Sequence, residues 1–152
     1  MTEIATTGGC LCGKVRYTLA VPPKGFGACH CGMCRKFSGG IELGIELMPG
    51  GIAWEGEENI GTFNSSEWAA RGFCKICGSS LFWQLKAEGK MNGLYSLSAG
   101  TLDSLEGLEL TGEVFIDHKP KGYDFAGNHT RMTEAEVMAM VASIEAGETK
   151  AP

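Results

Sequence analysis

Three cysteines fall within the short stretch CHCGMC, at Cys29, Cys31 and Cys34. Thiolates are the soft, charged ligands that hold zinc in proteins, at about 2.3 Å. If Cys29 and Cys31 lie in extended backbone, both side chains point to one side, because side chains alternate along a strand. Gly32 permits the tight turn that would bring Cys34 back to the same point. Three protein ligands leave one position of a tetrahedron open, which is the arrangement of a catalytic zinc.

A second group of cysteines consists of two close pairs that lie far apart in the sequence. Cys74 and Cys77 form a C-x-x-C pair followed by Gly78, the pattern of a zinc knuckle. The pair Cys10 and Cys12 would complete a site of four thiolates with no open position. Such a site would tie the first strand to a distant turn, and its binding energy would become folding energy.

Spacing alone also allows another division of the cysteines. The two C-x-x-C pairs could form an ordinary zinc ribbon, which would leave over Cys10, Cys12 and Cys29. Two features favour the division into four and three. Arg35, not glycine, follows Cys34, so this turn is a poorer knuckle, and the ribbon would leave Cys29 unused two residues from a ligand.

Length and composition predict one globular domain over residues 1–152. The chain is 43% hydrophobic and 20% charged, which is ordinary for a soluble protein. Its 23 glycines favour many short strands and tight turns over long helices. A net charge of −5 argues against nucleic acid or an anionic membrane as partner.

The cysteine usage predicts a reducing, cytoplasmic location. The first residues lack the basic and apolar segments of a signal peptide, and no apolar run approaches the roughly 20 residues that span a bilayer. Seven cysteines would leave one unpaired in any complete disulfide scheme, whereas four and three divide between two metal ions. Thiols stay available for metals in a reducing compartment.

The hydrophobic pattern is mainly that of β-strands. Strands are predicted at about 14–19, 41–47, 52–54, 60–63, 68–73, 81–86, 93–98 and 113–117. Within 41–47 the apolar residues alternate with Glu42, Gly44 and Glu46, and 52–54 and 60–63 are expected to form a hairpin. One helix is predicted at about 133–146. Thr133 and Glu136 have the spacing of a capping box, and Gly147 is a natural stop.

Four stretches resemble one enzyme family in the right order: residues 9–17, 29–36, 72–79 and 99–103. They are similar to the glutathione-dependent formaldehyde-activating enzymes, and the similarity runs from about residue 7 to 125. The resemblance implies a mostly β fold of several small antiparallel sheets, the β-tent. It also implies two zinc ions per chain, a structural one on Cys10, Cys12, Cys74 and Cys77 and a catalytic one on Cys29, Cys31 and Cys34.

The resemblance further implies a zinc-dependent carbon–sulfur lyase, similar to an S-(hydroxymethyl)glutathione synthase. A small thiol, glutathione or a related compound, would bind the open position as thiolate and add to formaldehyde or another small aldehyde. A different class of function stays open, a non-catalytic, zinc-stabilised binding or chaperone-like module of the same fold. The three-cysteine cluster argues against that module, because a scaffold needs no open metal position.

The other polar and aromatic candidates are expected to have structural or surface positions rather than catalytic roles. Strand alternation points His30 away from the face of Cys29 and Cys31, so we expect it to pack behind the site. The remaining polar candidates are expected on the surface: Arg35, Lys36, Arg71, His118 and His129. Tryptophans are expected in the core. Members of the family often have histidine where Glu113 stands here.

Overall fold

The computed structural model describes residues 5–148, and β-strands dominate this part of the chain. It contains eleven strands, two α-helices and three short 3-10 helices, so the predicted mainly β fold with a C-terminal helix is confirmed. The strands are β1 (Thr6–Gly9), β2 (Arg16–Leu19), β3 (Gly25–Cys29), β4 (Glu42–Leu47), β5 (Ile52–Glu55), β6 (Ile60–Asn64), β7 (Ala69–Cys74), β8 (Ser80–Leu85), β9 (Tyr95–Ser98), β10 (Glu109–Val114) and β11 (Thr130–Met132).

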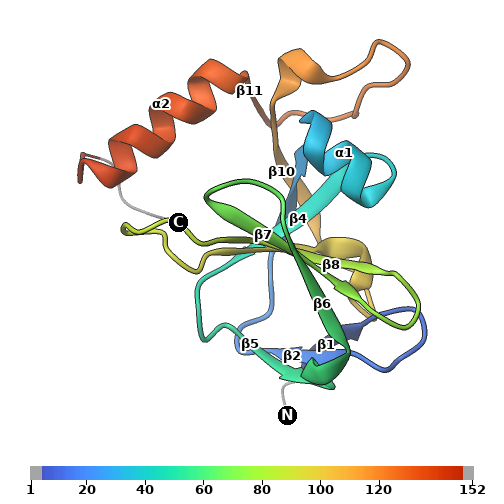
Figure 1. The fold of residues 1–152 in the computed structure, drawn as a ribbon. Helices are drawn as coiled ribbons and strands as arrows, with labels where there is room; N and C mark the ends of the chain where they lie inside the picture. The colour runs from blue at the N-terminus through green and yellow to red at the C-terminus, as the bar shows by residue number, and fades with distance from the viewer. Residues whose placement is uncertain (1–4, 149–152) are drawn as a thin grey trace.

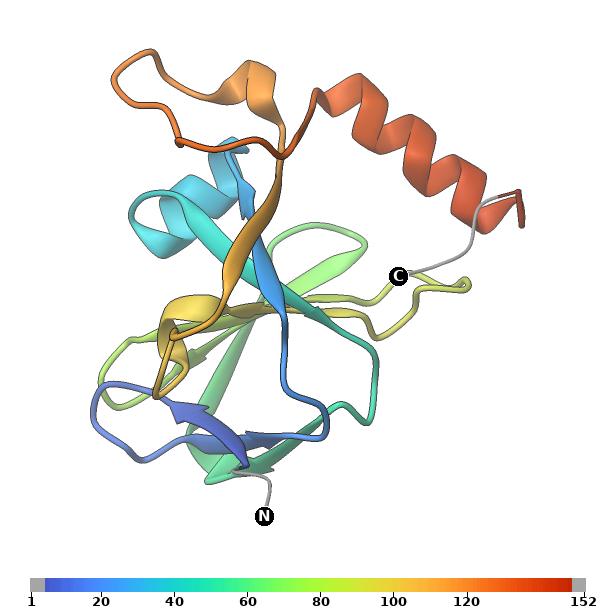
Figure 2. The same cartoon turned by 180° about the vertical axis from the view of Figure 1, so that it is seen from behind.

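The strands form two sheets (Figure 1). The smaller has the order β1-β2-β5 and the larger has the order β11-β10-β3-β4-β9-β8-β7-β6. Most pairings are antiparallel, as the family resemblance implies, but β10 runs parallel to both β3 and β11. Figure 2 shows β10 beside β3, although the two strands lie far apart in the sequence.

The predicted hairpin of residues 52–54 and 60–63 is wrong. β5 pairs with β2 in the small sheet, whereas β6 pairs with β7 at the edge of the large sheet. The 3-10 helix Glu57–Asn59 and Gly56, with φ of 74°, separate the two strands. The connection therefore carries the chain from one sheet to the other. The strand expected at 113–117 lies earlier in the chain, as β10 (Glu109–Val114). It pairs with β3 and β11.

A short helix that the sequence pattern did not predict follows the first cluster of cysteines. Cys31 caps the N-terminus of α1 (Gly32–Ser38), and its sulfur accepts a hydrogen bond from the backbone N–H of Cys34. It ends at Gly39, where φ is 79°. Seven residues are too few to show a clear apolar period, so the helix is stabilised by this cap and by its tertiary contacts.

The predicted C-terminal helix is confirmed as α2 (Glu134–Glu145). Its capping box is complete, because Thr133 and Glu136 exchange side-chain and backbone hydrogen bonds. Gly147 follows the end of the helix with φ of 78°. Ile144 packs with Met91 and Leu94, so this helix covers the long connection between β8 and β9.

The main hydrophobic core lies between the two sheets. Tyr17 and Leu19 of β2 pack against Ile45 of β4 and Leu97 of β9. A second cluster joins Val15 and Phe82 to two of the cysteines predicted as structural ligands. Trp54 contacts both clusters, as expected, whereas Trp68 is 51% exposed. No helix within residues 5–148 is long and apolar enough to cross a membrane.

Candidate metal centres

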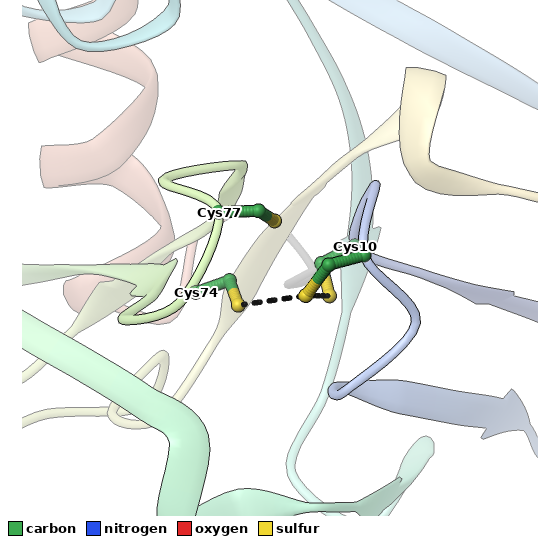
Figure 3. A group of neighbouring side chains, drawn as sticks. Cys10, Cys74 and Cys77 are labelled. Carbon is green, nitrogen blue, oxygen red and sulfur yellow. Dashed lines mark hydrogen bonds between the residues drawn. The ribbon is translucent and has the colours of Figure 1, made fainter.

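The structure brings the sulfur atoms of Cys10, Cys12, Cys74 and Cys77 together, all within 4.8 Å of one another. The sulfurs of Cys10 and Cys12 are 3.6 Å apart, and those of Cys12 and Cys74 are 3.8 Å apart. In Figure 3 the side chain of Cys10 points from one turn toward Cys74 and Cys77 on another. The two turns follow β1 and β7, so this cluster joins the small sheet to the large one.

Local backbone geometry directs these sulfurs. The N–H of Val15 donates to the Cys10 sulfur at 3.3 Å, and the N–H of Ile76 donates to the Cys74 sulfur at 3.4 Å. Gly78 has φ of 78°, the left-handed conformation that closes a knuckle turn. Hydrogen bonding from Ser79 lowers the pKa of Cys77 to about 5. The hydrogen bonds to these sulfurs favour their thiolate forms.

The donor set fits a tetrahedral, thiol-seeking metal. Four sulfurs at about 2.3 Å from a zinc ion lie about 3.8 Å from one another, which matches the two short separations here. A disulfide would need about 2.05 Å, and all seven cysteines are free thiols. Zinc as the ion in this position is a prediction that follows from the donor chemistry.

The second cluster, Cys29, Cys31 and Cys34, is built by a strand and the first turn of a helix. Cys29 ends β3, Cys31 caps α1, and Cys34 lies within α1. Their sulfur atoms lie within 4.8 Å of one another, and no further histidine, cysteine or carboxylate of residues 5–148 joins the group. The three thiols shift one another's pKa. Hydrogen bonds from Cys29 and Cys34 lower the pKa of Cys31, whereas those from Cys31 and Cys34 raise that of Cys29.

His30 lies behind this cluster, as predicted, and forms part of a buried network. Its Nε2 lies 2.7 Å from one carboxylate oxygen of Glu113, and His129 and Arg131 bind the other oxygen. Burial raises the pKa of Glu113, but hydrogen bonds from His129 and His30 outweigh burial and hold this pKa below its ordinary value. The prediction that His129 lies on the surface is wrong, since its side chain is 4% exposed.

Arg71 is a charged residue in direct contact with the three-thiol cluster, and the expectation that it is solvated is also wrong. It lies on β7 and is 3% exposed. Both of its terminal nitrogens donate to the Cys34 sulfur at 3.6 Å. Arg35 and Lys36 are exposed, as expected.

Glu42, which alternates with the apolar residues of its strand, is a further buried acid. It lies directly opposite Cys29 in the pairing of β3 with β4, and Ser98 donates a hydrogen bond to its carboxylate at 2.7 Å. Burial raises the pKa of Glu42. A cavity of about 230 Å³ adjoins it, and four hydroxyl side chains line this cavity: Ser38, Ser80, Ser98 and Thr101.

A second hollow, of about 300 Å³, has Arg71 among its lining residues. α1 contributes Met33, Lys36 and Phe37, and the segment that runs from β6 to β7 contributes Phe63, Ser65 and Arg71. Phe63 is 63% exposed. Each cavity is therefore lined by a residue that neighbours the three-thiol cluster: Glu42, opposite Cys29, in the hydroxyl-lined cavity, and Arg71, bonded to Cys34, in the largely apolar hollow.

Comparison with known proteins decides the family. The family model described as glutathione-dependent formaldehyde-activating enzyme matches residues 5–118. The chain belongs to this family. Both clusters of cysteines lie within the matched residues, as do Glu42, Arg71 and Glu113. His129 and Arg131, which bind Glu113, lie beyond them.

Two similar proteins extend the comparison. An uncharacterized lyase of Schizosaccharomyces pombe is 31% identical over 134 residues, which are 88% of this chain and 95% of the relative. A crystal structure of a Rhodobacter sphaeroides protein has a TM-score of 0.54 at 18% identity and covers 82% of this chain and 98% of that one. The structural likeness bears on the fold alone. The family and the relative support a lyase-type or formaldehyde-activating function.

Proposed function

We propose that this family member is a carbon–sulfur lyase that joins a small thiol, glutathione or a related compound, to formaldehyde or another small aldehyde. The observation that carries the proposal is the cluster of Cys29, Cys31 and Cys34. It gathers three sulfurs, and the described chain supplies no fourth ligand. A structural zinc site has four protein ligands and no open position. The other four cysteines already provide a set of four ligands.

The donor set suits zinc, and the proposed role of each cluster follows from its ligands. A zinc ion held by the three cysteines would supply a Lewis-acidic position where a thiol binds as its thiolate. The four-cysteine cluster would hold the two sheets together. In the reaction the thiol sulfur forms a bond to the carbonyl carbon. The carbonyl electron pair moves to oxygen, which takes a proton, and the reverse step breaks the carbon–sulfur bond.

The surroundings of the three thiols support this chemistry. Glu42 and the hydroxyl groups of Ser38, Ser80, Ser98 and Thr101 bound a cavity of a size that suits a small aldehyde. All four hydroxyl groups donate their protons within the protein. Their oxygens can therefore accept a hydrogen bond from the hydroxyl group that forms on the product. Because Glu42 lies opposite Cys29, an aldehyde in this cavity would face the thiol cluster.

The test is a thiol–aldehyde assay on the metal-loaded protein. Formation of the hydroxymethyl thioether from labelled formaldehyde is followed by NMR exchange, with glutathione, cysteine and 2-mercaptoethanol as separate thiols. We expect acceleration over the spontaneous reaction with at least one thiol and a metal content of two ions per chain. A protein that carries both ions but accelerates none of the thiols would favour the non-catalytic binding module.

A further inference from the structure

Arg71 is a buried cation whose orientation is fixed from three sides. Nε donates to the hydroxyl of Ser65 at 3.1 Å, and the guanidinium carbon lies 5.4 Å from the centre of the Phe37 ring. The two terminal nitrogens both point to the Cys34 sulfur, each at 3.6 Å. A side chain held in this way directs its charge at one atom of the three-cysteine cluster.

The charge of Arg71 has no carboxylate partner. None of the ion pairs among residues 5–148 includes this residue. Glu42 is near enough to feel its charge, but the carboxylate of Glu42 accepts a hydrogen bond from Ser98 instead. An isolated charge is costly to bury, and a guanidinium group stays charged in proteins. The acceptor that the terminal nitrogens of Arg71 contact directly is therefore the sulfur of Cys34 in the three-cysteine cluster.

The positive charge of Arg71 matters most when a fourth thiolate binds the metal. A divalent ion with three thiolates carries one net negative charge, and a fourth thiolate adds a second. Like charge opposes that second step, and the opposition is strong where water is excluded. A fixed guanidinium group beside Cys34 would remove one unit of negative charge from both states. A neutral fourth ligand would gain much less from the same cation.

We infer that Arg71 is a positioning residue that neutralises the three-cysteine centre and so selects an anionic fourth ligand, a thiolate, over a neutral one. The inference rests on the proposed function for its substrate class. It assigns Arg71 no contact with the reacting carbon; it acts through Cys34. The nearby Lys36 lines the same hollow but has no hydrogen bond to a sulfur, so it provides a matched comparison.

Three variants test the inference: Arg71→Met, Arg71→Lys and Lys36→Met. Each protein is loaded with Co²⁺, whose thiolate absorption bands report both clusters, and its metal content is measured. The cobalt protein is then titrated with 2-mercaptoethanol, an uncharged thiol that binds as thiolate, and separately with imidazole, a neutral ligand. The probes are small, so recognition of a larger substrate does not enter.

We expect Arg71→Met to bind 2-mercaptoethanol about tenfold or more weakly than the wild type. Its imidazole affinity should change by less than about threefold, because a neutral ligand adds no charge. Arg71→Lys should recover most of the thiol affinity, and Lys36→Met should behave as the wild type. A purely structural role of Arg71 would weaken both ligands together.

Three results would each overturn the inference. The first is wild-type thiol affinity in Arg71→Met with its metal retained. The second is an equal loss of thiol affinity in Arg71→Met and Arg71→Lys. The third is a wild-type cobalt protein whose bands do not respond to the thiol. The variants could show the predicted dependence of thiol binding on Arg71 while the wild-type protein does not accelerate addition of the thiol to aldehydes. That result would refute the proposed reaction and leave the role of Arg71 intact.

Discussion

Nε2 of His30 lies 2.7 Å from a carboxylate oxygen of Glu113, across 83 positions of sequence. The same carboxylate accepts a second hydrogen bond, of 2.6 Å, from His129. The rings of Tyr123 and Phe125 each lie with their centres 6.1 Å from the His30 ring. Residues beyond the family-matched part of the chain are thus fixed to the strand that carries Cys29.

Replacing Glu113 with glutamine should destabilise the protein at pH 7 by about 3 kcal/mol, because Arg131 and two histidines would lose a buried carboxylate. An amide offers one acceptor oxygen where the carboxylate offers two. Chemical denaturation of the metal-loaded protein measures the loss. Glu109→Gln is the matched control, since Glu109 lies on the same strand but is exposed.

A Glu113→Gln protein as stable as the Glu109→Gln control would show that the network contributes no net stability. A loss of stability without a loss of metal would place the role of Glu113 in folding. A loss of metal from the three-cysteine cluster would extend that role to His30 and its neighbours Cys29 and Cys31. Measurement of metal content on the same samples separates these two outcomes.

Gly72 lies opposite Phe82 in the pairing of β7 with β8. A Cβ atom at this position would lie 2.3 Å from the Phe82 ring, which packs edge-on against Tyr95. Gly72→Ala should therefore cost about 1–3 kcal/mol of stability through overpacking. Gly100→Ala is the control, because no atom lies within 4 Å of the added group. Equal melting temperatures for the two variants would contradict this prediction.

The three-cysteine cluster and each of the two close cysteine pairs could be predicted from the sequence because their geometry is local. Two thiols around a tight turn, or two on one side of a strand with a third a few residues later, converge whatever the rest of the fold does. The capping box of Thr133 is local in the same sense. Each of these patterns is complete within a few residues, but the joining of the Cys10 pair to the Cys74 pair spans 62 positions, and spacing alone also allowed the zinc ribbon.

The surroundings of the three thiols could not be predicted, because they depend on packing between distant segments. Arg71 resembles any solvated arginine in the sequence, and it is buried only because α1 packs against β7. Glu42 alternates with apolar residues, a pattern that normally places the acid in water. Helix α1 packs against β4, and Glu42 is buried. Ile45, on the opposite face of the strand, packs in the main hydrophobic core.

Loss of a structural ligand should unfold the chain. Cys74→Ser would remove one corner of the four-cysteine cluster, which connects Cys12 to Cys74 across 62 positions. Structural zinc contributes about 10–16 kcal/mol in small domains, which is comparable with the whole stability of a protein of this size. We expect an insoluble or non-cooperatively melting protein, measured by circular dichroism. An unchanged melting temperature would show that this cluster does not stabilise the fold.

Loss of a ligand from the other cluster should have a different effect. Cys34 lies within five residues of both partners, so Cys34→Ser opens no long loop and removes no link between the sheets. We expect a folded protein that keeps about one metal ion per chain and has thiol–aldehyde activity near background, since positioning of the thiol is worth several kcal/mol of barrier. Metal analysis, thermal melting and the assay are made on one preparation. If Cys34→Ser unfolds as Cys74→Ser does, the three-cysteine cluster is structural. If it keeps full activity, the reaction does not take place there.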